Sequence, residues 1–311
     1  MAIYTIDPTR ETLHGTFSRD YPPVLTIDSG DSVLFRTLNS GWAFEPPSFK
    51  TGKIKQFEPR LKGHDDGHAL CGPIAIREAQ PGMTLEIRIN EVLPGTWGWA
   101  CGGGMDTQIN QRLDLVGEKG IELTWELDAH AMTGKDQYGH TLALHPFMGV
   151  MGMPPAEPGV HSTTPPRFCG GNIDCKELVA GSTLYLPIAV PLALFSVGDG
   201  HGVQGDGEVS GVAIECPMER VDLTFQLRTD MHLTTPRAHT ASAWITLGFH
   251  ENLHEASLIA LEAMIDLMEE EYQLPRAQAL ALASLVVDLR VTQIVNRVLG
   301  VHAVLPHGAL K

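Results

Sequence analysis

Strict alternation of apolar and polar residues is the feature that most limits how this chain can fold. Apolar side chains take every second position in residues 85–90, 121–127 and 221–227. A period of two is that of a β-strand with one covered face. We therefore expect these three segments to be strands whose apolar face is buried.

A second recurring pattern consists of a strand, a glycine-containing turn and another strand. It occurs around residues 28–31, around Pro81-Gly82, and more weakly around Gly181. Glycine and aspartate in such turns indicate hairpins or strand corners. The pattern has no fixed period, and it favours a β-rich body built from related corners.

The period changes to a helical one from about Glu251. Apolar residues then recur at three- and four-residue spacing, with acidic residues on the opposite face, as in an amphipathic helix. Pro275 suits the first turn of a second helix reaching Asp288, and a third short helix is predicted over residues 292–298, ending at Gly300. The fold class expected is mainly β with appended α (α+β): a β-sandwich-like catalytic body over residues 1–248, with long functional loops, and a helical segment over 249–311 packed on the same domain.

Three connections, residues 39–72, 96–112 and 145–172, read as long irregular loops dense in glycine, proline, histidine and tryptophan. Loops of this length inside a compact domain are usually functional.

Charge and cysteine usage narrow the partners and the compartment. The net charge of −15 makes nucleic acid and anionic membranes poor partners. The apolar runs fall short of the roughly 20 residues that span a bilayer, and the start of the chain lacks a secretion pattern. Five scattered cysteines form no C-x-x-C pair, which indicates neither a zinc ribbon nor a disulfide framework. We expect a reduced, cytoplasmic protein.

The stretch 198–208 concentrates chemistry-bearing side chains. Its eleven residues hold five glycines together with Asp199, His201, Gln204, Asp206 and Glu208. Glycines allow close approach of a ligand to the backbone, and carboxylate and imidazole groups bind divalent ions. The apolar run 184–197 and the strand-like residues 209–214 flank it. It is either a metal-ligating loop or a polar turn that reverses the chain.

Three further clusters leave alternatives open. His64 and His68 flank two aspartates and either ligate a metal or carry no such role. The segment 169–176 is either a nucleophile site, with Cys175 beside Lys176, or a tight turn. His145 is either a ligand or a satisfied core histidine. The sequence has no nucleophile elbow, no phosphate loop and no G-x-G-x-x-G that follows a strand and opens a helix. Metal-assisted chemistry, a thiol nucleophile or a non-catalytic role remain.

Several of these motifs resemble the acetamidase/formamidase family. The matching runs are 194–201 and 204–211, 146–152, 170–174, 72–74 with 79–82, and 288–293 with 300–306, spread from about residue 12 to 307. The resemblance implies hydrolysis of formamide or acetamide to ammonia and a carboxylate. It also implies a β-rich fold with appended helices and often a bound divalent metal. We expect zinc as this metal, with calcium or magnesium as alternatives. Cys71 and Cys175 lie at positions where the family varies, which argues against a thiol mechanism.

Residues and resemblance together suggest how such a site would work. We expect His68, Asp199 and His201 to ligate the ion, whose bound water attacks the amide carbon. Glu208 is the candidate base, which would take the proton of the water and pass it to the leaving amine.

The remaining candidate residues surround this centre. Asn172 and Gln204 either orient the substrate amide or stabilise the oxyanion. Asp206 is either a fourth ligand or a partner that holds His201. Substrate contacts are expected from Phe147, Gly149 and Asp174.

Other functions and assemblies stay open at this level. A non-catalytic β-domain that binds a small amide, or a hydrolase of a larger amide on the same fold, would fit the same residues. The alanine-rich helix over residues 277–285 suits either a core position or a homo-oligomer, dimer or tetramer.

Overall fold

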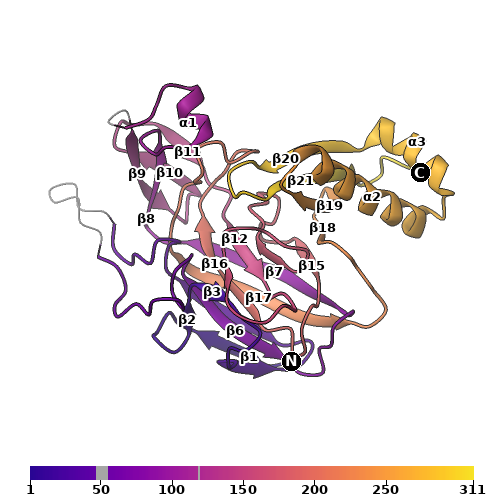
Figure 1. The fold of residues 1–311 in the computed structure, drawn as a ribbon, viewed down its shortest axis with the longest axis horizontal. Helices are drawn as coiled ribbons and strands as arrows, with labels where there is room; N and C mark the ends of the chain where they lie inside the picture. Colours follow the sequence, from indigo (N-terminus) through magenta and orange to yellow (C-terminus); the bar gives the residue numbers. More distant parts are fainter. Residues whose placement is uncertain (47–54, 118–119) are drawn as a thin grey trace.

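The structure, a computed structural model, describes residues 1–46, 55–117 and 120–311. Part of the predicted loop 39–72 therefore lies outside the described residues. Most elements of the described chain are strands, and the longer helices come near the C-terminus (Figure 1). The predicted mainly β architecture with C-terminal helices is confirmed.

The largest sheet has nine strands in the order β1-β5-β17-β7-β15-β18-β19-β21-β20. They are β1 (Ile3–Ile6), β5 (Ser32–Thr37), β17 (Met218–Arg228), β7 (Thr84–Pro94), β15 (Thr183–Pro187), β18 (Arg237–His239), β19 (Ala243–His250), β21 (Leu299–Pro306) and β20 (Asp288–Gln293). Strands β1 and β5 pair in parallel, and β7 pairs antiparallel with β17 and β15 at the centre.

A second sheet of six strands has the order β14-β12-β16-β6-β2, with β4 also beside β6. Its strands are β14 (Gly170–Asn172), β12 (Phe147–Gly152), β16 (Phe195–His201), β6 (Leu70–Ile76), β2 (Leu13–His14) and β4 (Leu25–Ile27). Strand β16 lies between β12 and β6 and is buried along its whole length.

Two smaller sheets complete the β-structure. One consists of β11 (Thr141–Ala143), β10 (Thr133–Asp136), β9 (Ile121–Asp128) and β8 (Trp97–Gly102), and the other pairs β13 (His161–Ser162) with β3 (Thr16–Phe17). The short helix α1 (Gln108–Arg112) follows β8. The segments 96–112 and 145–172, predicted to be irregular loops, contain strands. The prediction missed these strands because glycines among their apolar residues hide the alternation.

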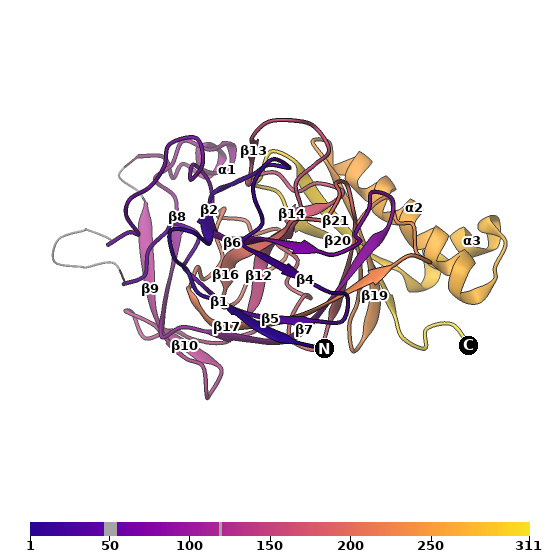
Figure 2. The same ribbon diagram turned by 90° about the horizontal axis from the view of Figure 1, so that it is seen from below.

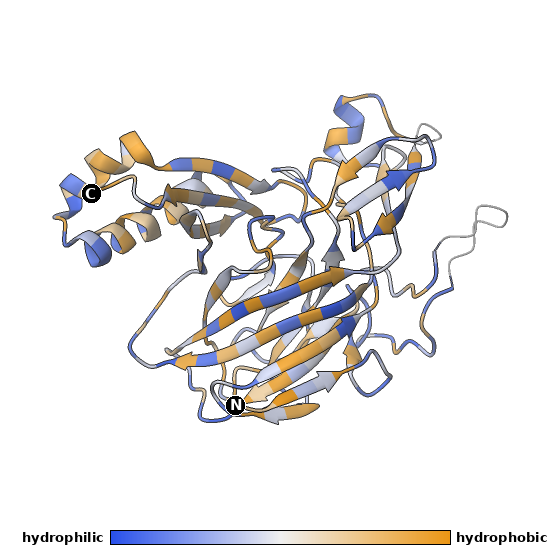
Figure 3. Cartoon of the chain, turned by 180° about the vertical axis from the view of Figure 1, so that it is seen from behind, coloured by the Kyte–Doolittle hydropathy of each residue, from blue (hydrophilic) through white to orange (hydrophobic). Residues whose placement is uncertain are grey.

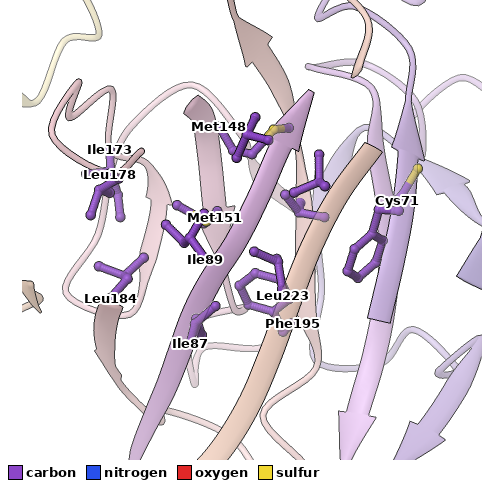
Figure 4. Close-up of a cluster of buried hydrophobic side chains, with 14 of the residues drawn as sticks. Cys71, Ile87, Ile89, Met148, Met151, Ile173, Leu178, Leu184, Phe195 and Leu223 are labelled. Atoms are coloured by element: carbon purple, nitrogen blue, oxygen red, sulfur yellow. The ribbon is translucent and has the colours of Figure 1, made fainter. Parts of the chain in front are cut away.

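The main core lies between the nine-stranded and six-stranded sheets. Figure 4 shows side chains of β7 and β17, such as Ile87, Ile89 and Leu223, close to Met151 of β12 and Phe195 of β16. The predicted alternation is thus confirmed for residues 85–90 and 221–227, whose apolar positions are buried or partly buried. In β9 only Trp125 and Leu127 are buried.

Two of the predicted turns carry the chain from one sheet to the other. Strand β4 pairs with β6, while β5, which follows the turn at residues 28–31, pairs with β17. In the same way β6 belongs to the six-stranded sheet and β7, after Gly82, to the nine-stranded one. These segments are corners of a sandwich.

The C-terminal helices are α2 (Leu253–Tyr272) and α3 (Arg276–Val286), and both predicted helices are confirmed. They extend from one end of the body in two perpendicular views (Figures 1 and 2). The third predicted helix is wrong, since residues 288–306 form the antiparallel pair β20 and β21 on the edge of the nine-stranded sheet. Division of the chain at residue 248 stays a prediction.

The glycine-rich stretch also differs from its prediction. Residues 198–201 form the end of strand β16, and only the part from Gly202 onward is loop. The strand-like residues 209–214 are irregular.

Candidate active site

Three neighbouring strands bring the predicted site residues together. Strand β16 carries Asp199 and His201, and β12 beside it pairs Phe147 with His201. On the other side of β12 lies β14, which leads into Asp174. The β-sandwich thus holds these side chains on rigid, buried backbone.

His201 is at the centre, with 1% of its surface exposed. Its Nε2 lies 3.4 Å from Oδ1 of Asp199 and 3.3 Å from Oε1 of Glu215. Both separations exceed an ordinary N–H···O hydrogen bond. Within the described ranges neither ring nitrogen has a hydrogen-bond partner, which is unusual for a buried imidazole. The rings of Phe147 and His201 form a T-shaped contact, with their planes at 90° and their centroids 5.0 Å apart.

The first donor cluster consists of Asp199, His201 and Glu215, whose ligand atoms all lie within 4.8 Å of one another. Glu215 is held in place by Ser40, which donates to its Oε2 at 2.8 Å, and by the backbone N–H of Ala213, which donates to Oε1 at 3.0 Å. All three side chains of the cluster are buried.

The second donor cluster consists of Asp174, His201 and Glu208, again within 4.8 Å. Asn296 donates from Nδ2 to Oδ2 of Asp174 at 2.6 Å. Across the described chain the other oxygen, Oδ1, accepts no hydrogen bond, and neither does Oε2 of Glu208. Two carboxylates with unpaired buried oxygens indicate that a proton, a cation or a substrate group belongs between them.

Gly149 leaves the room that these donors occupy. A Cβ at this position would lie 2.6 Å from Oδ2 of Asp199, 2.8 Å from Oδ1 of Asp174 and 2.8 Å from Cε1 of His201. Three of the five side chains in the two clusters, those of Asp199, Asp174 and His201, therefore lie against the backbone of β12. The absence of a side chain at Gly149 leaves the space in which these three side chains lie.

The electrostatics divide the carboxylates into two kinds. Burial alone would raise the pKa of Asp199, but the positive charges of His201 and His68 lower it below the ordinary value. Burial raises the pKa of Glu208 to about 8, and burial together with the charge of Glu208 raises that of Asp174 well above its usual range. The pKa of His201 is raised, since Glu215 and Asp199 outweigh its burial. Carboxyl groups whose pKa values are driven apart are candidates for different roles.

Asn172 and Gln204 both use their amide donors on backbone carbonyls. Nδ2 of Asn172 donates to Thr164 at 3.0 Å, and Nε2 of Gln204 donates to Asp174 at 2.8 Å. Their buried side-chain oxygens have no partner in the part of the chain that the structure describes. The unpaired oxygens suit the orienting role, while the second N–H of each NH2 group keeps the oxyanion role as an alternative.

His68 and Asp206 lie outside the two clusters. Nδ1 of His68 is 2.8 Å from Oγ1 of Thr163, and its charge acts on Asp199. Asp206 is directed away, with Oδ2 accepting from Arg290 at 2.5 Å and Oδ1 lying 3.1 Å from Lys176. The expectation that Asp206 is a ligand or holds His201 is thus not supported, because the side chains of Arg290 and Lys176 bind its carboxylate.

Glu215 and Asn296 were not predicted. Glu215 directly follows an apolar segment without a motif, and Asn296 lies where a helix was expected. Asp174 was expected to contact substrate, and it lies inside the second cluster.

An open cavity of about 430 Å³ borders the second donor cluster at Glu208. Its polar wall residues are Gln204, Asp206, Glu208 and Ser210, and the rest of the wall is mainly apolar. The apolar members are Ala100, Trp125, Leu142, Val203, Val209, Val212, Ala213 and Ile214.

Comparisons of the sequence and the fold with known proteins find acetamidases and formamidases among the similar chains. The model of the acetamidase/formamidase family matches residues 156–307. A Schizosaccharomyces pombe protein with a provisional formamidase assignment is 26% identical over 289 residues, which cover 72% of this chain and 68% of that protein. The crystal structure of a Bacillus halodurans acetamidase has a TM-score of 0.82 at 25% identity and covers 97% of both chains. A predicted acetamidase/formamidase of Thermoanaerobacter tengcongensis shares the fold, with a TM-score of 0.85, 22% identity and coverage of 98% and 96%.

Proposed function

Since the chain belongs to the acetamidase/formamidase family, we propose that it cleaves the C–N bond of short aliphatic amides to give ammonia and a carboxylate. One observation supports this reaction above the others. Glu208 borders both the buried donor cluster and the open cavity, so a substrate that enters the cavity meets a carboxyl group of raised pKa.

The donor set fits a divalent cation. Four carboxyl groups surround one imidazole, and several of their atoms are buried without partners among the described residues. Burying this many negative charges costs free energy unless a cation neutralises them. Asp199, His201 and Glu215 would hold the ion, and the imidazole favours zinc over calcium or magnesium. His68 stays a proposed ligand. Such an ion lowers the pKa of a coordinated water and polarises a carbonyl group.

The protein's own side chains then position the amide and move protons. Oε2 of Glu208 accepts a proton from the attacking water and donates it to the leaving amine. The unpaired oxygens of Asn172 and Gln204 accept hydrogen bonds from the substrate N–H groups. Asn296 keeps Asp174 oriented beside Glu208. Burial excludes bulk water from the reacting groups.

Replacement of Glu208 by Gln tests the proposal. Loss of the proton acceptor should lower kcat for ammonia release by roughly 10²–10⁴-fold, while the variant keeps the wild-type content of divalent metal. Glu219→Gln, which removes a carboxylate from the exposed surface, is the matched control. A Glu208→Gln variant with wild-type kcat would refute the role of this residue.

The size of the cavity favours a second candidate, an amidase for a larger aliphatic amide. A space of about 430 Å³ with a mainly apolar wall accepts acyl groups longer than acetyl. In the same ammonia assay kcat/KM should then rise from formamide towards butyramide or hexanamide. A steady fall along this series would assign the enzyme to the smallest amides.

Self-association and compartment belong to the same proposal. Helices α2 and α3 expose apolar residues that suit a second copy of this chain.

All five cysteines of the described structure are free thiols, which supports a reducing compartment such as the cytoplasm. Within the described ranges no helix is long and apolar enough to cross a membrane.

A further inference from the structure

A third group of metal-binding atoms lies apart from His201. Cys175, Glu177 and His302 place a thiol, a carboxylate oxygen and an imidazole nitrogen within 4.8 Å of one another. Cys175 and Glu177 lie in the turn that follows β14, and His302 comes from β21 at the other end of the sequence. Cys175 and His302 are completely buried.

His302 gives the independent sign of a ligand. Its Nδ1 lies 2.8 Å from Oγ1 of Thr292, which fixes the ring. Its Nε2 points to the cluster and, among the described residues, has no hydrogen-bond partner. The nearest carboxylate oxygen, Oε2 of Glu177, is 3.5 Å away, beyond an ordinary hydrogen bond. An orphaned nitrogen on a buried ring requires an explanation.

Two of the three separations match those of ligands around one ion. The thiol of Cys175 donates to Oε2 of Glu177 at 3.3 Å, and Nε2 of His302 lies 3.5 Å from the same oxygen. Ligands of tetrahedral zinc, at their usual bond lengths, are roughly 3.3–3.6 Å apart. Arg290 contacts the other oxygen of Glu177, Oε1, at 2.7 Å, and so leaves Oε2 directed at the cluster.

We propose that Cys175, Glu177 and His302 bind a zinc ion at a second site, separate from the catalytic cluster. The thiol loses its proton to solvent on binding, so one thiolate and one carboxylate neutralise the charge of the ion. Thiolate with imidazole selects zinc over magnesium and calcium. The fourth position is left for water.

The site has a structural role. It connects the turn that carries Asp174 to the β20–β21 pair. The loop between these two strands carries Asn296, which binds Asp174. The ion therefore fixes the C-terminal strands against the segment that positions a carboxylate of the active site.

Cobalt substitution tests the proposal without relying on activity. Metal-depleted full-length protein is titrated with Co²⁺, and the near-ultraviolet thiolate-to-cobalt charge-transfer band is recorded. The catalytic cluster holds only oxygen and nitrogen donors, so of the two sites only the second gives the band. We expect the band and two cobalt ions per chain in the wild type, and loss of the band and of one ion in Cys175→Ser.

Cys101→Ser is the matched control, because Cys101 is partly exposed and able to bind added metal by itself. The band should persist in this variant. If circular dichroism shows that Cys175→Ser does not fold, His302→Gln replaces it, and a loss or displacement of the band is then expected. A folded wild type without the band at saturating cobalt, or a band that survives both Cys175→Ser and His302→Gln, would overturn the second site.

Discussion

Gly149 shows at the scale of one residue how little space the active site leaves. Its φ lies outside the left-handed region, so alanine could adopt its backbone conformation. The constraint is instead the contact of a Cβ with Asp199, Asp174 and His201 at 2.6–2.8 Å, where real Cβ atoms essentially never lie. The neighbours are buried side chains of strand β16 and of the segment that follows β14, so they cannot move aside without losing their geometry.

Gly149→Ala should therefore abolish most activity while the fold persists. Displacement of catalytic groups by about 1 Å commonly costs around 10²-fold in rate, and we expect at least that loss in kcat for amide hydrolysis. Gly102→Ala is the control, since a Cβ there meets no heavy atom of the described chain within 4 Å. Equal activity of the two variants would show that the cluster tolerates the methyl group.

His14 is a buried histidine outside the active site. Its Nδ1 donates to the carbonyl of Thr16 at 2.7 Å, and Nε2 lies 2.9 Å from Oγ of Ser196. Burial lowers its pKa from 6.5 to about 4. Between these two pH values the unfolded chain binds a proton and the folded chain does not, so the free energy of unfolding falls as the pH falls.

The predicted loss from His14 is on the order of 3 kcal/mol between pH 7 and pH 4. Urea unfolding at both pH values measures it. His14→Gln should be less stable at pH 7 and lose less stability on acidification than the wild type. His254→Gln, on an exposed face of α2, should follow the wild type. Parallel acid profiles of the wild type and His14→Gln would contradict the assignment.

At the scale of elements, the packing of helix α2 depends on close backbone contact with β19. A Cβ on Gly248 would lie 2.1 Å from the carbonyl oxygen of Ala256 and 2.6 Å from the backbone nitrogen of Ala260. Thr246, on the same strand, donates from Oγ1 to the carbonyl of Ala260 at 2.7 Å. Small residues on both elements allow this approach.

Gly248→Ala should destabilise the protein, because the added methyl group meets helix backbone that cannot rotate away. Overpacking of this kind typically costs about 1–3 kcal/mol, and the urea midpoint should fall accordingly. Gly205→Ala, whose Cβ meets nothing within 4 Å in the described structure, should leave the midpoint nearly unchanged. An unchanged midpoint for Gly248→Ala would show that α2 can shift.

The sequence predicts elements where a pattern is local. Periodicity identified β7, β17, α2 and α3, and glycine turns marked the two sandwich corners. Periodicity failed at β20 and β21, because the apolar residues at helical spacing over 292–298 belong to the end of β20 and to its connection with β21. That error hid Asn296, which reaches Asp174 only through the pairing of β20 with β21.

The candidate site was likewise predictable only in part. Asp199, His201 and Glu208 lie in one motif, so their proximity follows from the sequence. Glu215 reaches His201 through an isolated β-bridge and forms another with Trp99. Isolated bridges of this kind leave no recognisable residue spacing in the sequence. Asp206 lies in the same motif, yet Arg290, 84 residues further along, draws it away. Long-range contacts of this kind are decided by the tertiary fold.

At the scale of the whole molecule, a large net negative charge coexists with an exposed apolar face on the C-terminal helices. The chain carries a net charge of −15, which opposes nonspecific association. Nevertheless α2 and α3, which lie at one end of the molecule (Figure 3), expose several leucines. Among them are Leu258, Leu280 and Leu285. An open groove of about 590 Å³ runs between the helices beside Leu258 and Leu280. Apolar patches of this kind on a charged protein mark interfaces.

A second copy of this chain is the partner that we expect on this face. Its own α2 and α3 offer the same leucines, and a two-fold axis would bring the two faces together. Light scattering should then give the wild type a mass of at least twice the 33.8 kDa of one chain. Leu280→Glu places a charge in the apolar groove and should shift the mass to that of one chain. Val160→Glu adds the same charge at an exposed apolar residue far from the helices in sequence and should keep the wild-type mass. A wild type that remains at the mass of one chain at every concentration would show that the helices face solvent.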